Sequence, residues 1–158
     1  MRMFNVNPIG KITVDQNEIL IIVESKYKQA LKELTGFSHV NVIWWFDDFD
    51  NVEARSIVEV EAPYKKAPQK MGIFATRSPI RPNPVALTVV QIINVDEDRG
   101  IIRIPYIDAN HGSPVIDLKP YTPSLDRVES PDVPDWCRHW PKSIEQSSDF
   151  DWDSEFNF

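Results

Sequence analysis

Residues 72–88 read GIFATRSPIRPNPVALT, and this stretch says most about the protein. Three prolines, two arginines and an asparagine lie between Arg77 and Pro84. Proline fixes its own φ and favours an extended conformation in the preceding residue, so Ser78, Arg81 and Asn83 are predicted to be extended. We expect a stiff loop whose planar guanidinium groups suit the recognition of an anion or a carboxylate. The alternative is a rigid structural loop with solvated arginines.

Short β-rich runs lie on both sides of this loop. The only helical pattern is an apolar stripe from Tyr27 to Leu34, which Gly36 ends. There is no alternation of strands and helices, so the fold is predicted to be mainly β, a small barrel or sandwich with one or two short helices, and not Rossmann-like. Strands are predicted at 8–14, 18–24, 39–46, 55–61, 73–76, 85–95 and 101–107, with a hairpin turn at 15–17.

Length and composition limit the class of protein. The chain has 158 residues, which favours one domain, and its single cysteine, Cys137, excludes an internal disulfide. His39, His111 and His139 lack metal-ligand spacing, so no metal site is expected. The longest apolar runs, such as 42–46, are far too short to cross a membrane, and the first residues do not resemble a signal peptide. We therefore expect a cytoplasmic protein without membrane contact.

Charge is unevenly distributed along the chain. Residues 143–158 contain five acidic residues and no basic one, alternating with aromatic residues. We expect a domain over 1–142 followed by this acidic aromatic tail, which is either disordered or docked. Residues 62–95 contain five basic residues and no acidic one, which allows contact with a polyanion. The net charge of −7 is not typical of a strong nonspecific nucleic-acid binder.

A second dense polar segment, residues 108–121, reads DANHGSPVIDLKPY. In an extended chain Asp117, Lys119 and Tyr121 project from one face. An acid, a base and a phenol on one face could hold a polar ligand or move a proton. The alternative is a surface ion pair between Asp117 and Lys119 beside a half-buried Tyr121. The five glycines are far apart, so a glycine-rich phosphate loop is excluded.

Residues 72–84 and 112–121 together resemble the motifs of the TsaA-like (TrmO) family, and residues 9–12 (IGKI) and 36–39 (GFSH) fit the same family. The resemblance covers roughly residues 8–126. It implies a small β-barrel, a homodimer and the cofactor S-adenosyl-L-methionine. It also implies a tRNA substrate, in which threonylcarbamoyladenosine next to the anticodon is methylated at N6.

The resemblance also implies roles for individual residues. Arg77 is expected to bind the cofactor carboxylate, and Asp108 the ribose hydroxyls or the amino group. Aromatic rings are expected to hold the sulfonium, the candidates being Trp44, Trp45, Phe46, Phe74 and Tyr106. The implied cofactor-binding residues are Phe46, Asp47, Arg77, Leu87, Pro105, Tyr106, Ile107 and Asp108. The candidate catalytic residues, which are expected to assist loss of the N6 proton, are Asp117, Lys119 and Tyr121.

The chain departs from the family pattern at three places. Asp47 replaces a histidine, the turn at 15–17 is shorter than a cofactor-contacting loop, and residues 110–114 (NHGSP) replace an Asp-Gly-Thr-Pro pattern. Other functions therefore stay open. They are a nucleoside-binding or S-adenosyl-L-methionine-binding module without catalysis, a methyltransferase with a non-tRNA acceptor, and a purely structural dimeric partner.

Overall fold

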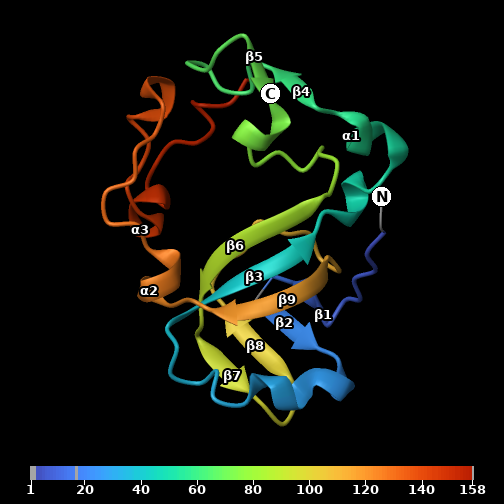
Figure 1. Ribbon diagram of the computed structural model, residues 1–158. Helices are drawn as coiled ribbons and strands as arrows, with labels where there is room; N and C mark the ends of the chain where they lie inside the picture. Colours follow the sequence, from blue (N-terminus) through green and yellow to red (C-terminus); the bar gives the residue numbers. More distant parts are fainter. Residues whose placement is uncertain (1–2, 17, 158) are drawn as a thin grey trace.

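Seven antiparallel strands form the main sheet of the computed structural model, which describes residues 3–16 and 18–157 (Figure 1). The strand order is β6-β3-β9-β1-β2-β8-β7, and a separate hairpin pairs β4 with β5. The fold is thus mainly β, as predicted. The bounds are β1 Gly10–Val14, β2 Ile19–Val23, β3 His39–Trp45, β4 Glu59–Glu61, β5 Lys70–Gly72, β6 Val85–Gln91, β7 Asn94–Asp96, β8 Ile101–Ile104 and β9 Pro114–Pro120.

The two edge strands of this sheet, β6 and β7, are consecutive in the chain and are separated only by Ile92 and Ile93. The Ile92 N–H donates to the Ser38 carbonyl at 2.8 Å, and the Ile93 N–H donates to the Arg103 carbonyl at 2.9 Å. The predicted strand 85–95 is therefore two strands, which pair with β3 and with β8. Complete closure into a barrel stays a prediction.

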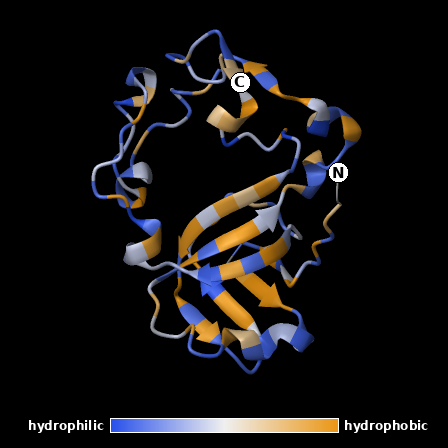
Figure 2. Ribbon diagram, viewed as in Figure 1, coloured by the Kyte–Doolittle hydropathy of each residue, from blue (hydrophilic) through white to orange (hydrophobic). Residues whose placement is uncertain are grey.

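The hydrophobic core lies on one face of the sheet. Val40, Val42 and Trp44 alternate along β3 and are buried, and they pack with isoleucines of β1, β2 and β8. Figure 2 shows apolar residues concentrated in these strands, with the loops more polar. The other face of β3 carries Ile43, which lies opposite Leu87 of β6 and Asp117 of β9.

The hairpin β1–β2 forms as predicted, with Gly10 opposite Val23. Gly10 is required by packing, because a Cβ atom there would collide with the Ile22 carbonyl oxygen. At the turn, the Glu18 N–H donates to the Asp15 carboxylate at 3.0 Å. The predicted turn includes Asn17, which lies outside the described residues.

All helices in the described residues are short. The predicted helix 27–34 is a 3-10 helix, η1, which ends at Leu31 because Lys32 is extended. The predicted strand 55–61 is wrong in its first half, because Asn51 caps a helix there by accepting from the Ala54 N–H. The prediction of a strand at 73–76 is wrong as well, because residues 73–75 form a 3-10 turn. The bounds are η1 Ser25–Leu31, η2 Asp47–Phe49, α1 Val52–Ser56, η3 Ile73–Ala75, α2 Pro123–Asp126, η4 Asp135–Cys137 and α3 Ile144–Ser147.

Residues 128–157 form a C-terminal segment that runs along one side of the fold and ends beside β4 and β5 (Figure 1, orange to red). Its end is joined to residues 62–65 by backbone hydrogen bonds. The Lys65 N–H donates to the Glu155 carbonyl at 2.9 Å, and the Asn157 N–H donates to the Pro63 carbonyl at 3.2 Å. The segment therefore docks on the chain beside residues 62–65.

Candidate functional site

A groove of about 1630 Å³ lies between β6, the proline-rich loop and the C-terminal segment. Four of the eight implied cofactor-binding residues line it: Phe46, Arg77, Leu87 and Asp108. Its volume exceeds the range of roughly 300–1,000 Å³ that is usual for a small-ligand pocket. The groove can therefore hold a cofactor and part of a second molecule.

The proline-rich loop holds Arg77 against β6. The Arg77 Nη1 atom donates to the Leu87 carbonyl oxygen at 3.0 Å. The loop is braced from within by the buried Thr76, whose hydroxyl donates to the Ile73 carbonyl at 2.8 Å and accepts from the Ser78 N–H at 3.2 Å. The loop backbone is thus held in place, and the Arg77 side chain lies against β6 along the groove instead of simply extending into solvent.

Asp108 is joined to the same strand one residue further along. The Thr88 hydroxyl donates to the Asp108 carboxylate at 3.0 Å. Since Leu87 and Thr88 are neighbours, Arg77 and Asp108 are attached to adjacent residues of β6. A guanidinium and a carboxylate therefore border one groove, as a zwitterionic ligand would require.

The aromatic candidates differ in their positions. Trp44 is only 2% exposed, so the expectation that it offers an open face to a ligand is wrong. Its ring instead contacts the edge of Phe46, with centroids 4.5 Å apart, and Phe46 lines the groove. Phe74 also lines the groove and is exposed. Trp45 donates to Asp50 at 3.0 Å beside the η2 turn.

Four of the implied cofactor-binding residues do not line the groove in the described structure. Asp47 begins η2 and is exposed. Pro105 and Tyr106 are exposed after β8, whereas Ile107 is buried in the core. The roles of these four residues toward a cofactor stay predictions.

The candidate catalytic residues lie on and just beyond β9. The Asp117 carboxylate and the Lys119 ammonium form an ion pair of 2.7 Å, and this hydrogen bond raises the pKa of Lys119 above its ordinary value of 10.5. Tyr121 contacts the edge of His39, with ring centroids 6.2 Å apart. These side chains do not line the groove in the described structure, and Ile43 separates Asp117 from Leu87 on the sheet. Their catalytic role stays a prediction.

The sequence pattern did not identify the second wall of the groove, which consists of aromatic side chains. Tyr64 stacks on Trp136, with centroids 5.4 Å apart at 15°, and contacts the edge of Trp140 at 4.9 Å. Trp140 in turn contacts Trp152 at 5.3 Å. All of them line the groove, and burial raises the pKa of Tyr64. The only sequence signal was the aromatic content of the C-terminal residues.

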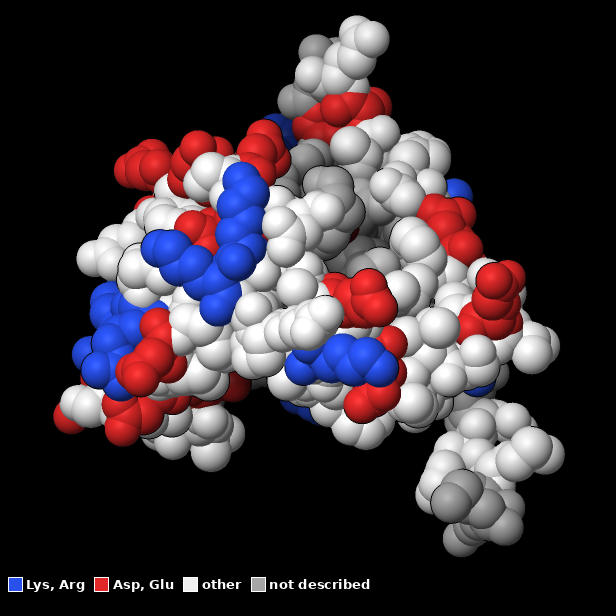
Figure 3. Space-filling view, turned by 90° about the horizontal axis from the view of Figure 1, so that it is seen from above, with Lys and Arg blue, Asp and Glu red and all other residues white. Residues whose placement is uncertain are grey.

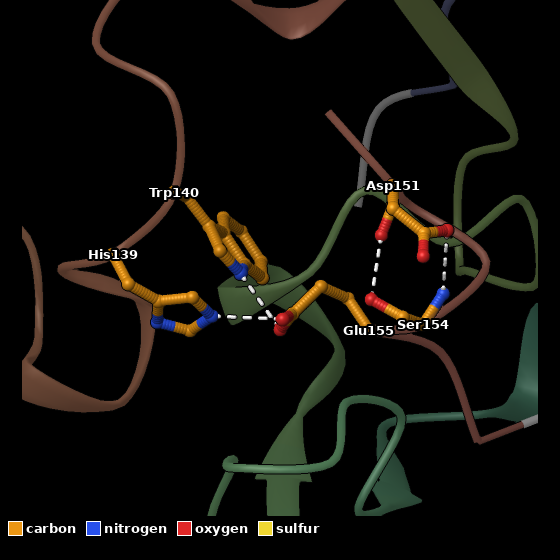
Figure 4. A network of polar contacts seen from close by, with 5 residues as sticks. All are labelled: His139, Trp140, Asp151, Ser154 and Glu155. Atoms are coloured by element: carbon orange, nitrogen blue, oxygen red, sulfur yellow. Dashed lines mark hydrogen bonds and ion pairs between the residues drawn. The ribbon is translucent and has the colours of Figure 1, made fainter. Parts of the chain in front are cut away.

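A buried carboxylate holds this wall together (Figure 4). Glu155 is only 8% exposed and accepts hydrogen bonds from His139 Nε2 at 2.9 Å and Trp140 Nε1 at 3.2 Å. Because a carboxylate only accepts, His139 Nε2 must carry the hydrogen. The bond from His139 lowers the pKa of Glu155. Nearby, Ser154 bonds twice to Asp151, which shapes the turn before Glu155.

Charges of both signs surround the groove. Lys70, Arg77 and Arg81 line it together with Glu61 and Asp108. Figure 3 shows lysine and arginine gathered on one side of the upper face, with aspartate and glutamate close beside them. No group of three or more metal-ligating side chains occurs among the described residues. Within residues 3–16 and 18–157, no helix is long and apolar enough to cross a membrane.

The chain is similar to proteins of one family over most of its length. Residues 3–127 match the tRNA-methyltransferase O N-terminal domain family. An S-adenosyl-L-methionine-binding protein of Archaeoglobus fulgidus is 35% identical over 119 residues, which are 75% of this chain and 78% of that protein. The tRNA (adenine(37)-N6)-methyltransferase of Escherichia coli is 31% identical over 121 residues, which are 75% of this chain and 51% of that protein.

A crystal structure of TrmO from Pseudomonas aeruginosa superimposes with a TM-score of 0.63 at 25% identity, covering 84% of this chain and 61% of that one. The family match ends at residue 127, so the C-terminal segment, with Trp136, Trp140 and Trp152 of the aromatic wall, lies outside it, whereas Tyr64 lies inside it. The resemblance seen in the sequence motifs is confirmed, and the chain belongs to the tRNA-methyltransferase O (TrmO) N-terminal domain family.

Proposed function

We propose that this protein is an S-adenosyl-L-methionine-dependent methyltransferase that modifies N6 of adenosine in tRNA, the acceptor being threonylcarbamoyladenosine beside the anticodon. Family membership and the name of the Escherichia coli relative support the reaction class. The observation that carries the proposal is the attachment of Arg77 and Asp108 to adjacent residues of β6 at one groove.

The groove residues fit the proposed cofactor, which supplies the methyl group as a sulfonium. Arg77 would bind its carboxylate, because a guanidinium has five N–H donors and the Nη1 bond to Leu87 leaves others for a ligand. Asp108 would accept from hydroxyl or amino groups of the nucleoside, and Phe46 would supply an aromatic face for the sulfonium. Transfer is an in-line displacement, so the chain acts mainly by positioning the reactants.

Asp117, Lys119 and Tyr121 are proposed to assist loss of the N6 proton. Ile43 of β3 pairs with Leu87 of β6 on one side and with Asp117 of β9 on the other. Asp117 therefore lies on the same face of the sheet as the groove residue Leu87. The proton-accepting group must be freed from the Asp117–Lys119 ion pair when the acceptor binds. The rest of the proposed cofactor set consists of Asp47, which follows β3, and Pro105, Tyr106 and Ile107, which follow β8.

A cytoplasmic homodimer with a closed barrel over 1–142 and a tail over 143–158 is the proposed form of the protein. The junction at Ile92 and Ile93, which bonds to both sides of the sheet, supports closure.

A second candidate function is a module that binds the cofactor or a nucleoside without catalysis. The Asp117–Lys119 ion pair favours it, because both candidate catalytic groups are already partnered. A methyltransferase with a non-tRNA acceptor is favoured by the acidic side chains among the basic ones near the groove.

Mass spectrometry of tRNA nucleosides distinguishes these functions. The tRNA is incubated with the protein, with and without S-adenosyl-L-methionine, and then digested. The proposed function predicts a new N6-methylated threonylcarbamoyladenosine that requires both components. Cofactor binding in calorimetry without any new tRNA nucleoside would support the module or another acceptor, and absence of binding would reject the cofactor itself.

A further inference from the structure

A chain of hydrogen bonds leads from the core to the groove through three side chains. Trp44 Nε1 donates to Thr88 Oγ1 at 3.0 Å, and Thr88 Oγ1 donates to Asp108 Oδ1 at 3.0 Å. Trp44 lies opposite Ala86 in the β3–β6 register, so Thr88 is its diagonal neighbour on the same face. Thr88 and Asp108 line the groove, whereas Trp44 is buried.

The direction of this chain is fixed by chemistry. An indole N–H can only donate, a carboxylate can only accept, and a hydroxyl has one hydrogen to give. Thr88 therefore uses a lone pair for Trp44 and its single hydrogen for Asp108. The two bonds cannot exchange roles, so Oδ1 of Asp108 is engaged and Oδ2 is left for a ligand in the groove.

We propose that Thr88 is a positioning residue, which Trp44 holds in place and which orients the Asp108 carboxylate toward an N–H or O–H donor of the bound nucleoside. This inference rests on the proposed function. A carboxylate that is already oriented loses less rotamer freedom on binding, so pre-organisation increases affinity. Trp44 also packs against Phe46, so one buried ring supports two residues of the groove.

Three variants test the role of Thr88 by calorimetric titration with S-adenosyl-L-methionine. Thr88→Val keeps the branched shape and removes the hydroxyl, and we expect about 10-fold weaker binding. Thr88→Ser restores the hydroxyl and is expected to bind within about two-fold of wild type. Thr13→Val on β1, which does not line the groove, is the matched control and should leave affinity unchanged.

A double-mutant cycle separates positioning from general damage to the fold. In an Asp108→Ala background, Thr88→Val should weaken binding by less than about two-fold, because the residue through which Thr88 acts is gone. A full 10-fold loss in that background would overturn the inference. If Thr88→Val fails to fold, Thr88→Cys replaces it, since a thiol is a weak donor and should give intermediate affinity.

The ligand-free protein gives an independent readout. Hydrogen exchange of the Trp44 indole N–H, followed by NMR, should be slow in wild type and Thr88→Ser and faster in Thr88→Val. Equal exchange in all three would overturn the hydrogen-bond chain. Wild-type protein that binds no S-adenosyl-L-methionine would overturn the proposed function together with this inference. Equal affinity of wild type and Thr88→Val would overturn the inference alone.

Discussion

Arg77 Nη1 donates a hydrogen bond of 3.0 Å to the carbonyl oxygen of Leu87, and this bond fastens the proline-rich loop to the edge strand β6. The next residue of the strand, Thr88, donates a hydrogen bond from its hydroxyl to the Asp108 carboxylate. The groove therefore has a positive and a negative group whose separation is set by one strand. Such a pair is suited to a ligand that itself carries both charges.

Replacing Arg77 by alanine should weaken the binding of S-adenosyl-L-methionine by about 1.5–3 kcal/mol, because a hydrogen bond to a charged carboxylate is lost. Calorimetric titration measures the change. Arg99→Ala removes the same charge in the β7–β8 turn, away from the groove, and should bind like wild type. Equal affinities of all three proteins would show that Arg77 does not contact the ligand.

Much of the sheet could be predicted from sequence, because β-branched runs and turn residues are local signals. The side of β3 that faces the core could not be predicted, since residues 39–46 are apolar on both faces. Trp44 and Trp45 look equivalent in the sequence. In the folded sheet Trp44 pairs with Ala86 and is buried, whereas Trp45 pairs with Val85 and points to the other face.

The part of the site that depends on local sequence could be predicted, and the part that depends on contacts between distant residues could not. The stiffness of the proline-rich loop is local, so Arg77 was recognised. The aromatic wall depends on contact between Tyr64 and Trp136, which are distant in sequence. Composition alone could not decide whether the acidic tail docks, because the buried Glu155 depends on hydrogen bonds from His139 and Trp140 that only the folded chain forms.

Gly10→Ala should destabilise the protein by roughly 2 kcal/mol or more, because the added methyl group collides with backbone of β2 and the hairpin must shift. Chemical denaturation measures the free energy of unfolding. Gly72→Ala is the control, since a Cβ there meets nothing within 4 Å. A Gly10→Ala protein as stable as Gly72→Ala would contradict the β1–β2 packing.

Docking of the C-terminal segment should depend on pH through Glu155. Its folded pKa lies below the ordinary value of 4.5, mainly because of the bond from His139, with Lys66 a smaller contribution. A depressed carboxyl pKa stabilises the folded form above 4.5, and this stabilisation is lost as pH falls from 4.5 through the folded pKa. Tryptophan fluorescence should therefore change in that acidic range.

Glu155→Gln tests this dependence, because glutamine cannot ionise. We expect weaker docking at neutral pH and a smaller fluorescence change on acidification. Asp153→Asn makes the same chemical change at an exposed position of the segment and should keep the wild-type profile. Identical profiles for wild type and Glu155→Gln would exclude Glu155 as the titrating group.

Substitution of the candidate catalytic residues should reduce turnover more than cofactor binding. The variants Asp117→Asn, Lys119→Met and Tyr121→Phe remove the acid, the base and the phenol, and general acid–base assistance is typically worth about 10²–10⁴-fold in rate. Single-turnover methylation of tRNA measures the rate, and calorimetry measures affinity. Wild-type turnover in all three variants would leave the Asp117–Lys119 ion pair as a surface contact only.

The most direct measurement is a crystal structure of the protein with S-adenosyl-L-methionine bound. We predict density for the ligand in the groove bordered by Phe46, Arg77 and Asp108, with its carboxylate within hydrogen-bond distance of the Arg77 guanidinium. A ligand bound elsewhere on the chain, with Arg77 and Asp108 free of it, would contradict the account.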